Sequence, residues 1–291
     1  MNKIILKLPL FFSFSWLILF FIFPFIIIFA VALSLPIEAI PPFEPFIRYA
    51  KEIGIIINPT LENFSLLFTD KAYLNAYLLS LRLAVETTII TLILGYPIAL
   101  YIASKKEKTR KTLLMLILIP FFTSLLIRIY AWMILLKKTG LINKTLLKIG
   151  LISKPIIFLN NEYAVLIGMV YSYLPFMILP IYSVIEKISP EIVEASHDLG
   201  ARNFTTLFKI VIPMSVKGII SGSLLVFIPA VGEFVIPELL GGSEVMTIGK
   251  LIWTEFFIIR NWPVAASMAV SLSILLILPI FILRKLDKEE R

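Results

Sequence analysis

The ionisable side chains that interrupt long apolar segments are the residues best placed to do chemistry in this sequence. Carboxylates stand at Glu233 and Glu238 in one such segment, and Arg82 and Glu86 stand four residues apart in another. Arg128 is the one charge in a third. A charge inside a membrane costs roughly 2.5–3.5 kcal/mol on insertion scales, so it usually pairs with another charge or lines a polar cavity. Carboxylates in such a cavity can bind a cation.

Each of these charges also has a plainer interpretation. The i, i+4 pair shares one helical face and can simply neutralise itself. Glu233 can pair with Arg128, and Glu238 can lie solvated at the membrane interface. On a regular helix Glu233 and Glu238 would face about 140° apart. They border one cavity only if Pro237 breaks the helix.

Other kinds of chemistry are poorly supplied. The chain has no cysteine and a single histidine, His197, which predicts no disulfide and no metal site. The motifs G-x-x-x-x-G-K-[ST], H-E-x-x-H and G-x-S-x-G are absent, and Gly249-Lys250 lacks a preceding glycine at the required spacing. We therefore expect no catalytic residue and no cofactor in this chain, although a membrane-embedded enzyme stays open as an alternative.

The composition explains why lipid is the expected solvent. Of 291 residues, 59% are hydrophobic and 16% are charged, against about 45–50% and about 25% in soluble domains. The mean hydropathy is +0.97. These values exclude a water-soluble globular enzyme and a disordered chain. The net charge of +8 is typical of a membrane protein with basic cytoplasmic loops, so we expect no nucleic acid partner.

Spanning a bilayer takes roughly 20 apolar residues as a helix, and six segments meet that length. The predicted helices cover residues 13–35, 73–103, 112–136, 163–186, 218–240 and 262–283. The first has the basic start and small residues of a signal peptide. Its apolar run is far longer than the 7–15 residues of a signal core, which favours an uncleaved anchor.

Lysine and arginine counts predict the orientation. With the N-terminus inside, the inside segments 1–12, 104–111, 187–217 and 284–291 hold 15 basic residues, and the longer outside loops hold 10. Both termini are therefore expected in the cytoplasm. The outside loop 137–161, with five lysines, is an exception to this pattern. The other long outside loop, 36–72, is acidic and rich in proline, which indicates a solvated cap or a docking surface for an external partner.

The most informative segment is the predicted cytoplasmic loop 187–217. Ser189-Pro190 is typical of a helix start, and Gly200 suits a left-handed helix stop. A second amphipathic helix follows, with Phe204 on its apolar face, and is expected to end near Pro213. Glu191, Glu194 and Asp198 form an acidic stripe on the first helix.

This pattern predicts a helical element that docks on another protein. The small Ala195 permits close approach, the acidic stripe offers charge complementarity, and Phe204 can serve as an anchor. A helix lying on the membrane surface is the alternative. An acidic stripe next to anionic lipid argues against it.

The loop resembles a known motif. Glu194-Ala195-Ser196, Gly200 and Ile210-Val211-Ile212-Pro213 match the spacing of the E-A-A-x3-G-x9-I-x-L-P loop of ABC importer permeases, with Ser196 and Ile212 as mild departures. Further stretches resemble the spermidine/putrescine permease subunits of bacterial polyamine importers. These are Leu94 to Pro97, Leu126 to Tyr130, Tyr173 to Met177, Ser183 to Lys187, Asp198 to Ala201 and Gly241-Gly242.

The resemblance implies an all-α integral membrane protein of the type I ABC importer permease fold. It would have six transmembrane helices and a cytoplasmic coupling helix between helices 4 and 5, in the inner membrane of a bacterial cell. The implied organisation is a first helix and external loop (1–72), a permease core (73–283) and a cytoplasmic tail (284–291). The implied partners are a second homologous permease, two ATPase subunits that hold ATP and magnesium, and an extracytoplasmic substrate-binding protein.

The resemblance also assigns candidate residues. Contacts to the ATPase would come from Glu191, Glu194, Ala195, Asp198, Gly200 and Phe204. A pathway for a polyamine needs carboxylates and aromatic faces, and the candidates are Glu233, Glu238, Glu86, Tyr96, Trp132 and Phe234. The alternatives are a permease for another solute (an anion, a metal ion or another organic cation) and a sensor or scaffold that only binds an ATPase.

Overall fold

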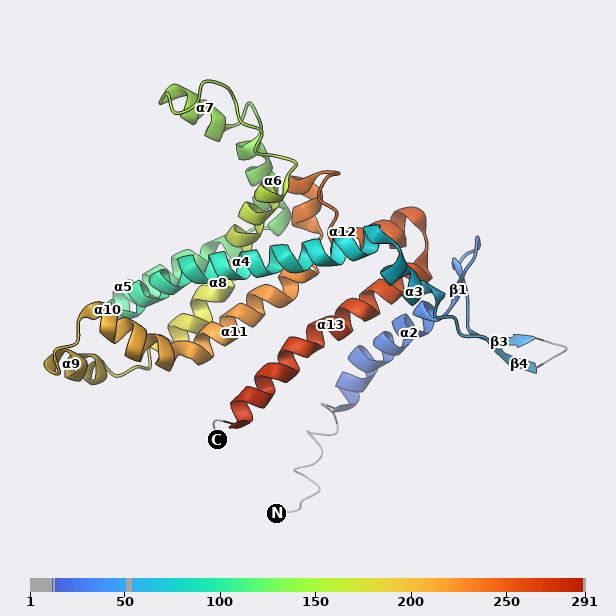
Figure 1. Cartoon of the computed structure of the whole chain (residues 1–291), viewed down its shortest axis with the longest axis horizontal. Helices are drawn as coiled ribbons and strands as arrows, with labels where there is room; N and C mark the ends of the chain where they lie inside the picture. Colours follow the sequence, from blue (N-terminus) through green and yellow to red (C-terminus); the bar gives the residue numbers. More distant parts are fainter. Residues whose placement is uncertain (1–11, 13, 51–53, 290–291) are drawn as a thin grey trace, which may run out of the picture. The chain divides into compact units, whose positions relative to one another are not determined.

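The computed structural model describes residues 12, 14–50 and 54–289, and that part of the chain is mostly helical (Figure 1). The chain forms two compact units. One comprises Met1–Ala76 and Leu251–Arg291, and the other comprises Tyr77–Lys250. The basic residues Lys3, Lys7 and Arg291, which contributed to the predicted orientation, lie outside the described residues.

The unit 77–250 is built from helices alone among its described residues. They are α4 (Lys71–Ala103, which begins in the other unit), α5 (Glu107–Leu118), α6 (Leu125–Leu136), α7 (Leu141–Lys148), α8 (Glu162–Ile185), α9 (Pro190–Asp198), α10 (Asn203–Thr206), α11 (Ile212–Val231) and α12 (Ile248–Trp253). Helix α8 is the best buried of the long apolar helices, and α11 packs against it.

Two glycines bring α11 close to α8. A Cβ added at Gly218 would lie 2.9 Å from the carbonyl oxygen of Pro180, and one added at Gly222 would lie 2.9 Å from Sδ of Met177. Small residues four apart let two helix backbones approach in a membrane, where packing rather than the hydrophobic effect holds helices together. The G-x-x-x-G pattern was visible in the sequence but was not among the predicted features.

Gly222→Leu should therefore disrupt the α8–α11 contact. The leucine would have to displace Met177, and overpacking of this kind costs typically about 1–3 kcal/mol. We expect a lower yield of chain in the membrane and aggregation in size-exclusion chromatography. Ser221→Leu, on the exposed neighbouring position, is the matched control, and equal behaviour of the two variants would contradict the packing role.

The predicted helix 112–136 is two helices in the structure. Helix α5 and a 3-10 turn (Ile119–Phe122) end before Thr123, α6 starts at Leu125, and the two runs meet at 90°. Thr123 is extended, with φ −104° and ψ 150°. Pro120, at the start of the 3-10 turn, lacks the N–H that would extend the α-helical hydrogen bonding.

The predicted helix 218–240 is also corrected at both ends. One helical run extends from Asn203 to Val231, so the second helix of the cytoplasmic loop does not end near Pro213. A π-helical turn (Leu207–Val211) precedes this proline, and such turns occur where the regular hydrogen bonding of a helix is interrupted. The run stops at Gly232, and a separate π-helical turn (Pro237–Gly241) follows.

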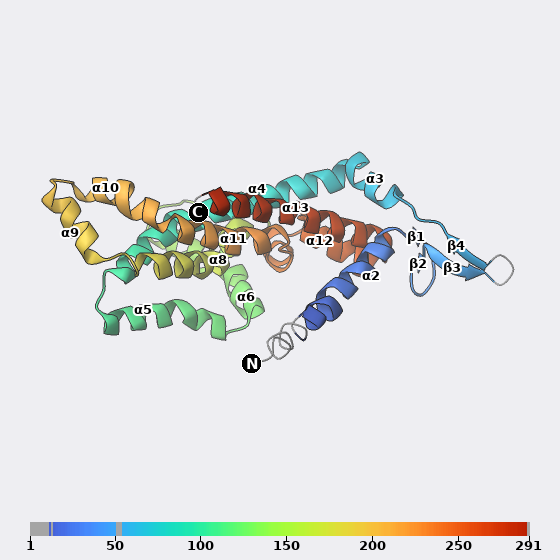
Figure 2. The same cartoon turned by 90° about the horizontal axis from the view of Figure 1, so that it is seen from below.

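The other unit pairs two apolar helices, α2 (Phe23–Ala32), which follows a π-helical turn (Ile18–Ile22), and α13 (Trp262–Glu289) (Figures 1 and 2). Ala32, Ala266 and Val270 form the buried contact between them. The side chain of Asn63 in α3 (Glu62–Thr69) donates to the carbonyl oxygens of Ala32 and Ser34, both at 2.9 Å. Asn63 thus satisfies orphan carbonyl groups at the end of α2.

The proline-rich loop 36–72 contains more regular structure than expected. Two antiparallel hairpins pair β1 (Leu35–Pro36) with β2 (Phe43–Glu44) and β3 (Ile47–Ala50) with β4 (Gly54–Ile57). Helix α3 follows them.

A π-helical turn (Thr254–Ile259) precedes α13.

Four helical runs among the described residues are long and apolar enough to cross a membrane. They are Phe14–Ala32, Lys71–Ala103, Glu162–Ile185 and Asn203–Val231. The bent pair of α5 with α6 and α7 is a further candidate, and the apolar helix Trp262–Ile277 is shorter. The predicted helices 13–35, 73–103 and 163–186 each match one of these runs with small changes in their bounds, and 218–240 matches part of the fourth run. The count of six spans stays a prediction.

Candidate functional site

The loop 187–217 forms the predicted helix, glycine turn and second helix. Gly200 has φ +82°, the left-handed conformation that glycine adopts without a side-chain penalty. The N–H of Gly200 donates to His197 O at 2.8 Å and that of Ala201 to Ser196 O at 3.0 Å, which is the Schellman pattern of helix termination. Figure 2 shows α9 and α10 extending beyond the ends of α8 and α11.

A buried hydroxyl pair joins the two helices of this element. The Oγ of Ser196 lies 2.9 Å from Oγ1 of Thr206, and both residues are buried. Ser196 also donates to the carbonyl oxygen of Val193 at 2.7 Å. The serine that departs from the E-A-A pattern therefore fastens α9 to α10, a role that its sequence context did not predict.

Removing this contact should loosen the element without unfolding the chain. We expect Ser196→Ala to weaken the α9–α10 contact by about 1 kcal/mol, the net worth of a typical hydrogen bond. Thr206→Ser keeps a hydroxyl at the partner position and should behave as wild type. The readout is hydrogen exchange of the α9 amides. Equal protection in Ser196→Ala and wild type would show that the Ser196–Thr206 hydrogen bond does not hold the two helices together.

The outer face of this element is acidic and apolar. Glu191, Glu194, Ala195 and Asp198 are exposed on α9, and 76% of Phe204 is exposed on α10. The predicted cap residue Ser189 occupies the N-cap position but makes no capping hydrogen bond to a backbone N–H; it donates to the carboxylate of Glu191 instead. The predicted docking residues thus share one exposed knob, which we call the α9–α10 knob.

Glu233 stands where the helical run of α11 breaks. Its Oε2 accepts a hydrogen bond from the hydroxyl of Tyr173 at 2.5 Å. Its Oε1 accepts from the backbone N–H of Val235 at 3.0 Å, so it caps the start of the next helical segment. The helix is interrupted at residues 232–234, where Glu233 itself lies, and helical structure resumes before Pro237. The expected break at Pro237 is therefore wrong.

Glu233 makes no ion pair with Arg128 within the described part of the chain, and that alternative is wrong. The guanidinium of Arg128 lies 5.2 Å from the ring centre of Phe121, and its buried Nε has no hydrogen-bond partner among the described residues. Phe121 contacts Phe176 edge to face, with ring centres 5.2 Å apart. Phe176 in turn lies 6.2 Å from the ring of Tyr173, so aromatic faces connect the arginine to the Glu233 site.

Glu238 is neither fully solvated nor alone. Nζ of Lys250 lies 2.9 Å from Oε2 of Glu238 and donates to the carbonyl oxygen of Gly242 at 2.5 Å. The lysine side chain is 10% exposed and that of Glu238 is 54% exposed. In the sequence, Lys250 stands out only as an incomplete match to a nucleotide-binding motif, and its pairing with Glu238 was not predicted.

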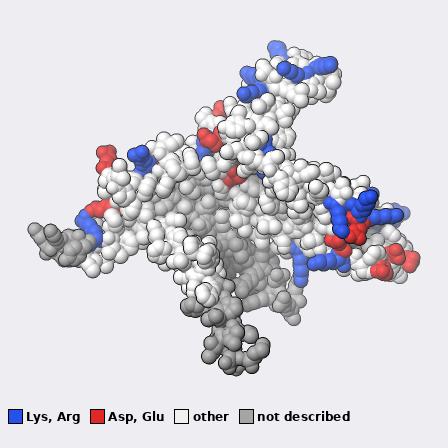
Figure 3. Space-filling view, turned by 180° about the vertical axis from the view of Figure 1, so that it is seen from behind, with Lys and Arg blue, Asp and Glu red and all other residues white. Residues whose placement is uncertain are grey.

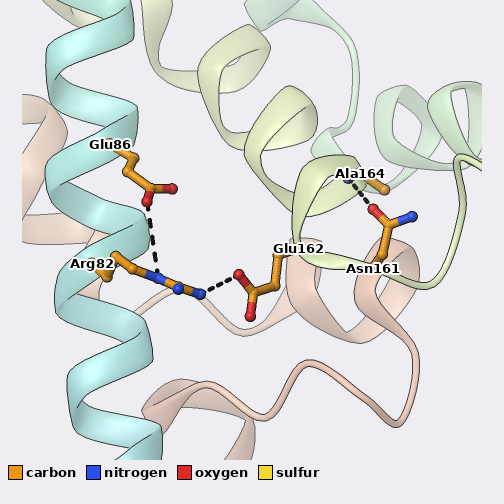
Figure 4. A network of polar contacts seen from close by, with 5 residues as sticks. All are labelled: Arg82, Glu86, Asn161, Glu162 and Ala164. Carbon is orange, nitrogen blue, oxygen red and sulfur yellow. Dashed lines mark hydrogen bonds and ion pairs between the residues drawn. The ribbon is translucent and has the colours of Figure 1, made fainter.

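Arg82 pairs across two helices rather than only along one. Its guanidinium contacts the carboxylate of Glu162 at the start of α8, and its Nε lies 3.9 Å from Glu86 on α4. Figure 4 shows the arginine between the two carboxylates. Asn161, at the N-cap of α8, accepts from the N–H of Ala164 at 3.0 Å and fixes the helix end that carries Glu162. The predicted i, i+4 pair is present but is the longer of the two contacts.

The three predicted aromatic pathway residues lie on different segments of the chain. Tyr96 is buried, with its hydroxyl 2.9 Å from Oγ of Ser215. Trp132 packs edge to face on Tyr171 at 5.6 Å, and Phe234 follows Glu233 at the helix break. Within the described residues, no group of three or more histidines and carboxylates could hold a metal ion.

Two further features lie outside these sites. The pKa of the Glu255 carboxyl is raised by burial, against the lowering effect of a hydrogen bond from Tyr73 at 2.8 Å. Neither Glu255 nor Tyr73 was predicted as a site residue from the sequence.

In the unit 77–250, Figure 3 shows lysines gathered on the lobe of α7 and mixed charges at the end that carries α9 and α10.

A comparison with protein families identifies the family of this chain. Residues 95–289 match the model of the binding-protein-dependent transport system inner membrane component family. The chain belongs to this family. It is therefore a multi-pass inner-membrane permease, and its curated relatives are named as transport permeases rather than as enzymes. The α9–α10 knob, Glu233 and the Lys250–Glu238 pair all lie inside the matched region.

This permease is similar in sequence to a curated transport permease. It is 43% identical over 229 residues to the spermidine/putrescine transport system permease protein PotB of Haemophilus influenzae, covering 79% of this chain and 80% of the relative. Among solved structures, a bacterial ABC transporter involved in the import of the acidic polysaccharide alginate contains a chain with TM-score 0.71 and 17% identity. That match covers 98% of this permease and 95% of the transporter chain.

A second structure of a bacterial alginate ABC transporter, in complex with alginate pentasaccharide-bound periplasmic protein, has TM-score 0.70 and 18% identity. It covers 96% of this permease and 92% of its chain. At these identities the likeness establishes the ABC importer permease fold and says nothing of the cargo.

Proposed function

We propose that this chain is a membrane subunit of an ATP-driven importer for polyamines such as spermidine and putrescine. The observation that carries the proposal is the 43% identity to a spermidine/putrescine permease over 79% of the chain. The charges agree with a cationic cargo, because Glu233 has no cation in ion-pair contact among the described residues and Glu238 is half exposed. The shared fold alone would not select this cargo, since it also serves an importer of an acidic polysaccharide.

The pathway residues of the proposal are Glu233 and Glu238, supported by the aromatic faces of Trp132 and Phe234. Glu86, which already pairs with Arg82, would contribute negative charge at the edge of the pathway. Tyr96 would hold α4 to α11 through its hydrogen bond with Ser215. Carboxylates attract the ammonium groups of the cargo, and aromatic faces add cation–π contacts worth about 0.5–2 kcal/mol each.

The α9–α10 knob is proposed to be the contact with an ATPase partner. Glu191, Glu194, Asp198 and Phe204 provide its charged and apolar contacts, and Ala195 and Gly200 its close approach. The chain has no phosphate-binding loop of the G-x-x-x-x-G-K-[ST] type, so ATP and magnesium belong to the partners. Two ATPase subunits, a second permease and an extracytoplasmic binding protein complete the proposed complex.

The proposed placement follows from the knob and the basic loops. The proposed topology has six spans and both termini in the cytoplasm. Its permease core covers residues 73–283, between the N-terminal segment 1–72 and the tail 284–291. This topology puts the knob on the cytoplasmic side. The segment between Glu233 and α13 then lies toward the outside, where a binding protein would release cargo.

The test is uptake of radiolabelled spermidine by proteoliposomes that contain the purified complex, ATP inside and the binding protein outside. ATP-dependent accumulation that unlabelled putrescine reduces is the expected result. Accumulation of another solute but not of polyamines would assign the same machine a different cargo. ATP-independent or absent uptake of every tested solute would favour a sensor or scaffold.

A further inference from the structure

The two partners of the Lys250–Glu238 ion pair differ in their exposure to solvent. The ammonium is held at 2.9 Å from the carboxylate and at 2.5 Å from the carbonyl oxygen of Gly242. Its side chain is nine-tenths buried, whereas half of the Glu238 side chain is exposed. The carboxylate therefore has one side on the lysine and another side open.

The oxygens that hold this ammonium are fixed by backbone structure. Gly242 has φ +61°, and a Cβ there would lie 3.1 Å from Asn160. The start of α12 is anchored by the N–H of Ile248, which donates to Oγ of Ser80 at 2.8 Å. A Cβ at Gly249 would lie only 2.4 Å from the carbonyl oxygen of Gly232. These contacts position both the carbonyl acceptor and the lysine.

The chemistry of the occupant points to a ligand class. A lysine side chain is four methylene groups that end in a primary ammonium, which is the structure of one end of an aminobutyl chain. A carboxylate and a backbone carbonyl around Nζ satisfy two of its three donors. The same oxygens would satisfy the terminal ammonium of an alkylamine in the same way.

We infer that the Glu238 carboxylate and the Gly242 carbonyl form a binding site for the primary ammonium end of the cargo, and that Lys250 is its tethered occupant. The inference rests on the proposed function and extends it to a defined ligand group. Cargo enters by displacing the lysine, so one ammonium replaces another and the carboxylate always has a partner. The Glu238 carboxylate is therefore never left without a counter-charge, which would be costly.

Lys250→Met tests the inference in the purified complex in nanodiscs, without binding protein. Methionine keeps an unbranched side chain but removes the competing charge. We expect Lys250→Met to bind radiolabelled putrescine about tenfold more tightly than wild type in equilibrium dialysis, because the carboxylate is then free. Lys250→Met with Glu238→Gln should lose this gain.

Equal binding by Lys250→Met and by the double variant would overturn the inference. If Lys250→Met does not assemble, Lys250→Gln takes its place, since its amide can still donate to the Gly242 carbonyl.

A second measurement separates this inference from the proposed cargo. Lys250→Ala leaves space for an added amine, so n-butylammonium should raise the unfolding temperature of this variant and n-butanol should not. Neither should stabilise wild type. A shift without polyamine uptake by wild type would retain the ammonium site and reject the proposed cargo. Uptake by wild type with no amine-specific shift would retain the cargo and reject the site.

Discussion

Glu194→Lys should abolish ATP-driven uptake while the chain still inserts into the membrane. Glu194 is exposed in the middle of the acidic stripe on α9, so the substitution disturbs no buried contact. Reversing a charge in a docking surface places like charges opposite each other, which costs several kcal/mol. We expect uptake to fall by roughly a hundredfold or more, with loss of ATPase during purification of the complex.

A matched control isolates the docking effect from a general effect of charge. Glu107→Lys reverses an exposed carboxylate at the start of α5, where Glu107 pairs only with the exposed Lys111 among the described residues. Surface pairs of this kind are worth about 0–1 kcal/mol, so this variant should transport normally. Glu194→Lys that retained its ATPase and transported like Glu107→Lys would remove the knob from the coupling role.

Glu233→Gln should lower polyamine uptake by about tenfold to a hundredfold with little effect on assembly, the expected loss for one charge contact of roughly 1.4–2.8 kcal/mol. The glutamine carbonyl can still accept from the N–H of Val235, and its amide can donate to the hydroxyl of Tyr173. The helix break is therefore kept, and the negative charge alone is lost. The measurement is initial uptake rate against spermidine concentration.

Tyr173→Phe distinguishes charge from hydrogen bonding at this position. The phenylalanine removes the 2.5 Å hydrogen bond to Glu233 but leaves the carboxylate and the aromatic face. We expect its uptake to stay within about threefold of wild type, the effect of one modest hydrogen bond. A larger loss in Tyr173→Phe than in Glu233→Gln would mean that the pair serves structure rather than cargo.

Local features were predictable because they depend on neighbouring residues. The apolar runs of α4 and α8, and the first helix and glycine turn of the knob, were placed to within a few residues. Gly200 was identified as a left-handed stop, and its φ of +82° agrees. Period, capping chemistry and the special conformation of glycine act over one or two turns. A single sequence contains that information.

The bends and breaks were less predictable. Several prolines lie in the apolar segments, and the sequence does not show which of them interrupts a helix. The helical run continues through Pro213, which follows a π-helical turn, whereas the chain changes direction by 90° shortly after Pro120. Whether a proline bends or ends a helix depends on how neighbouring groups satisfy the freed carbonyl, and those neighbours come from packing.

By itself, the sequence determined the membrane solvent, most of the helical segments and the exposed acidic knob. The tertiary structure decided the partners of three ionisable residues in the apolar segments: Glu162 for Arg82, Lys250 for Glu238 and Tyr173 for Glu233. The first and last of these pairs join residues 80 and 60 positions apart. Charge pairing is a property of helices brought together, because attraction between side chains falls with their distance in space and not along the chain.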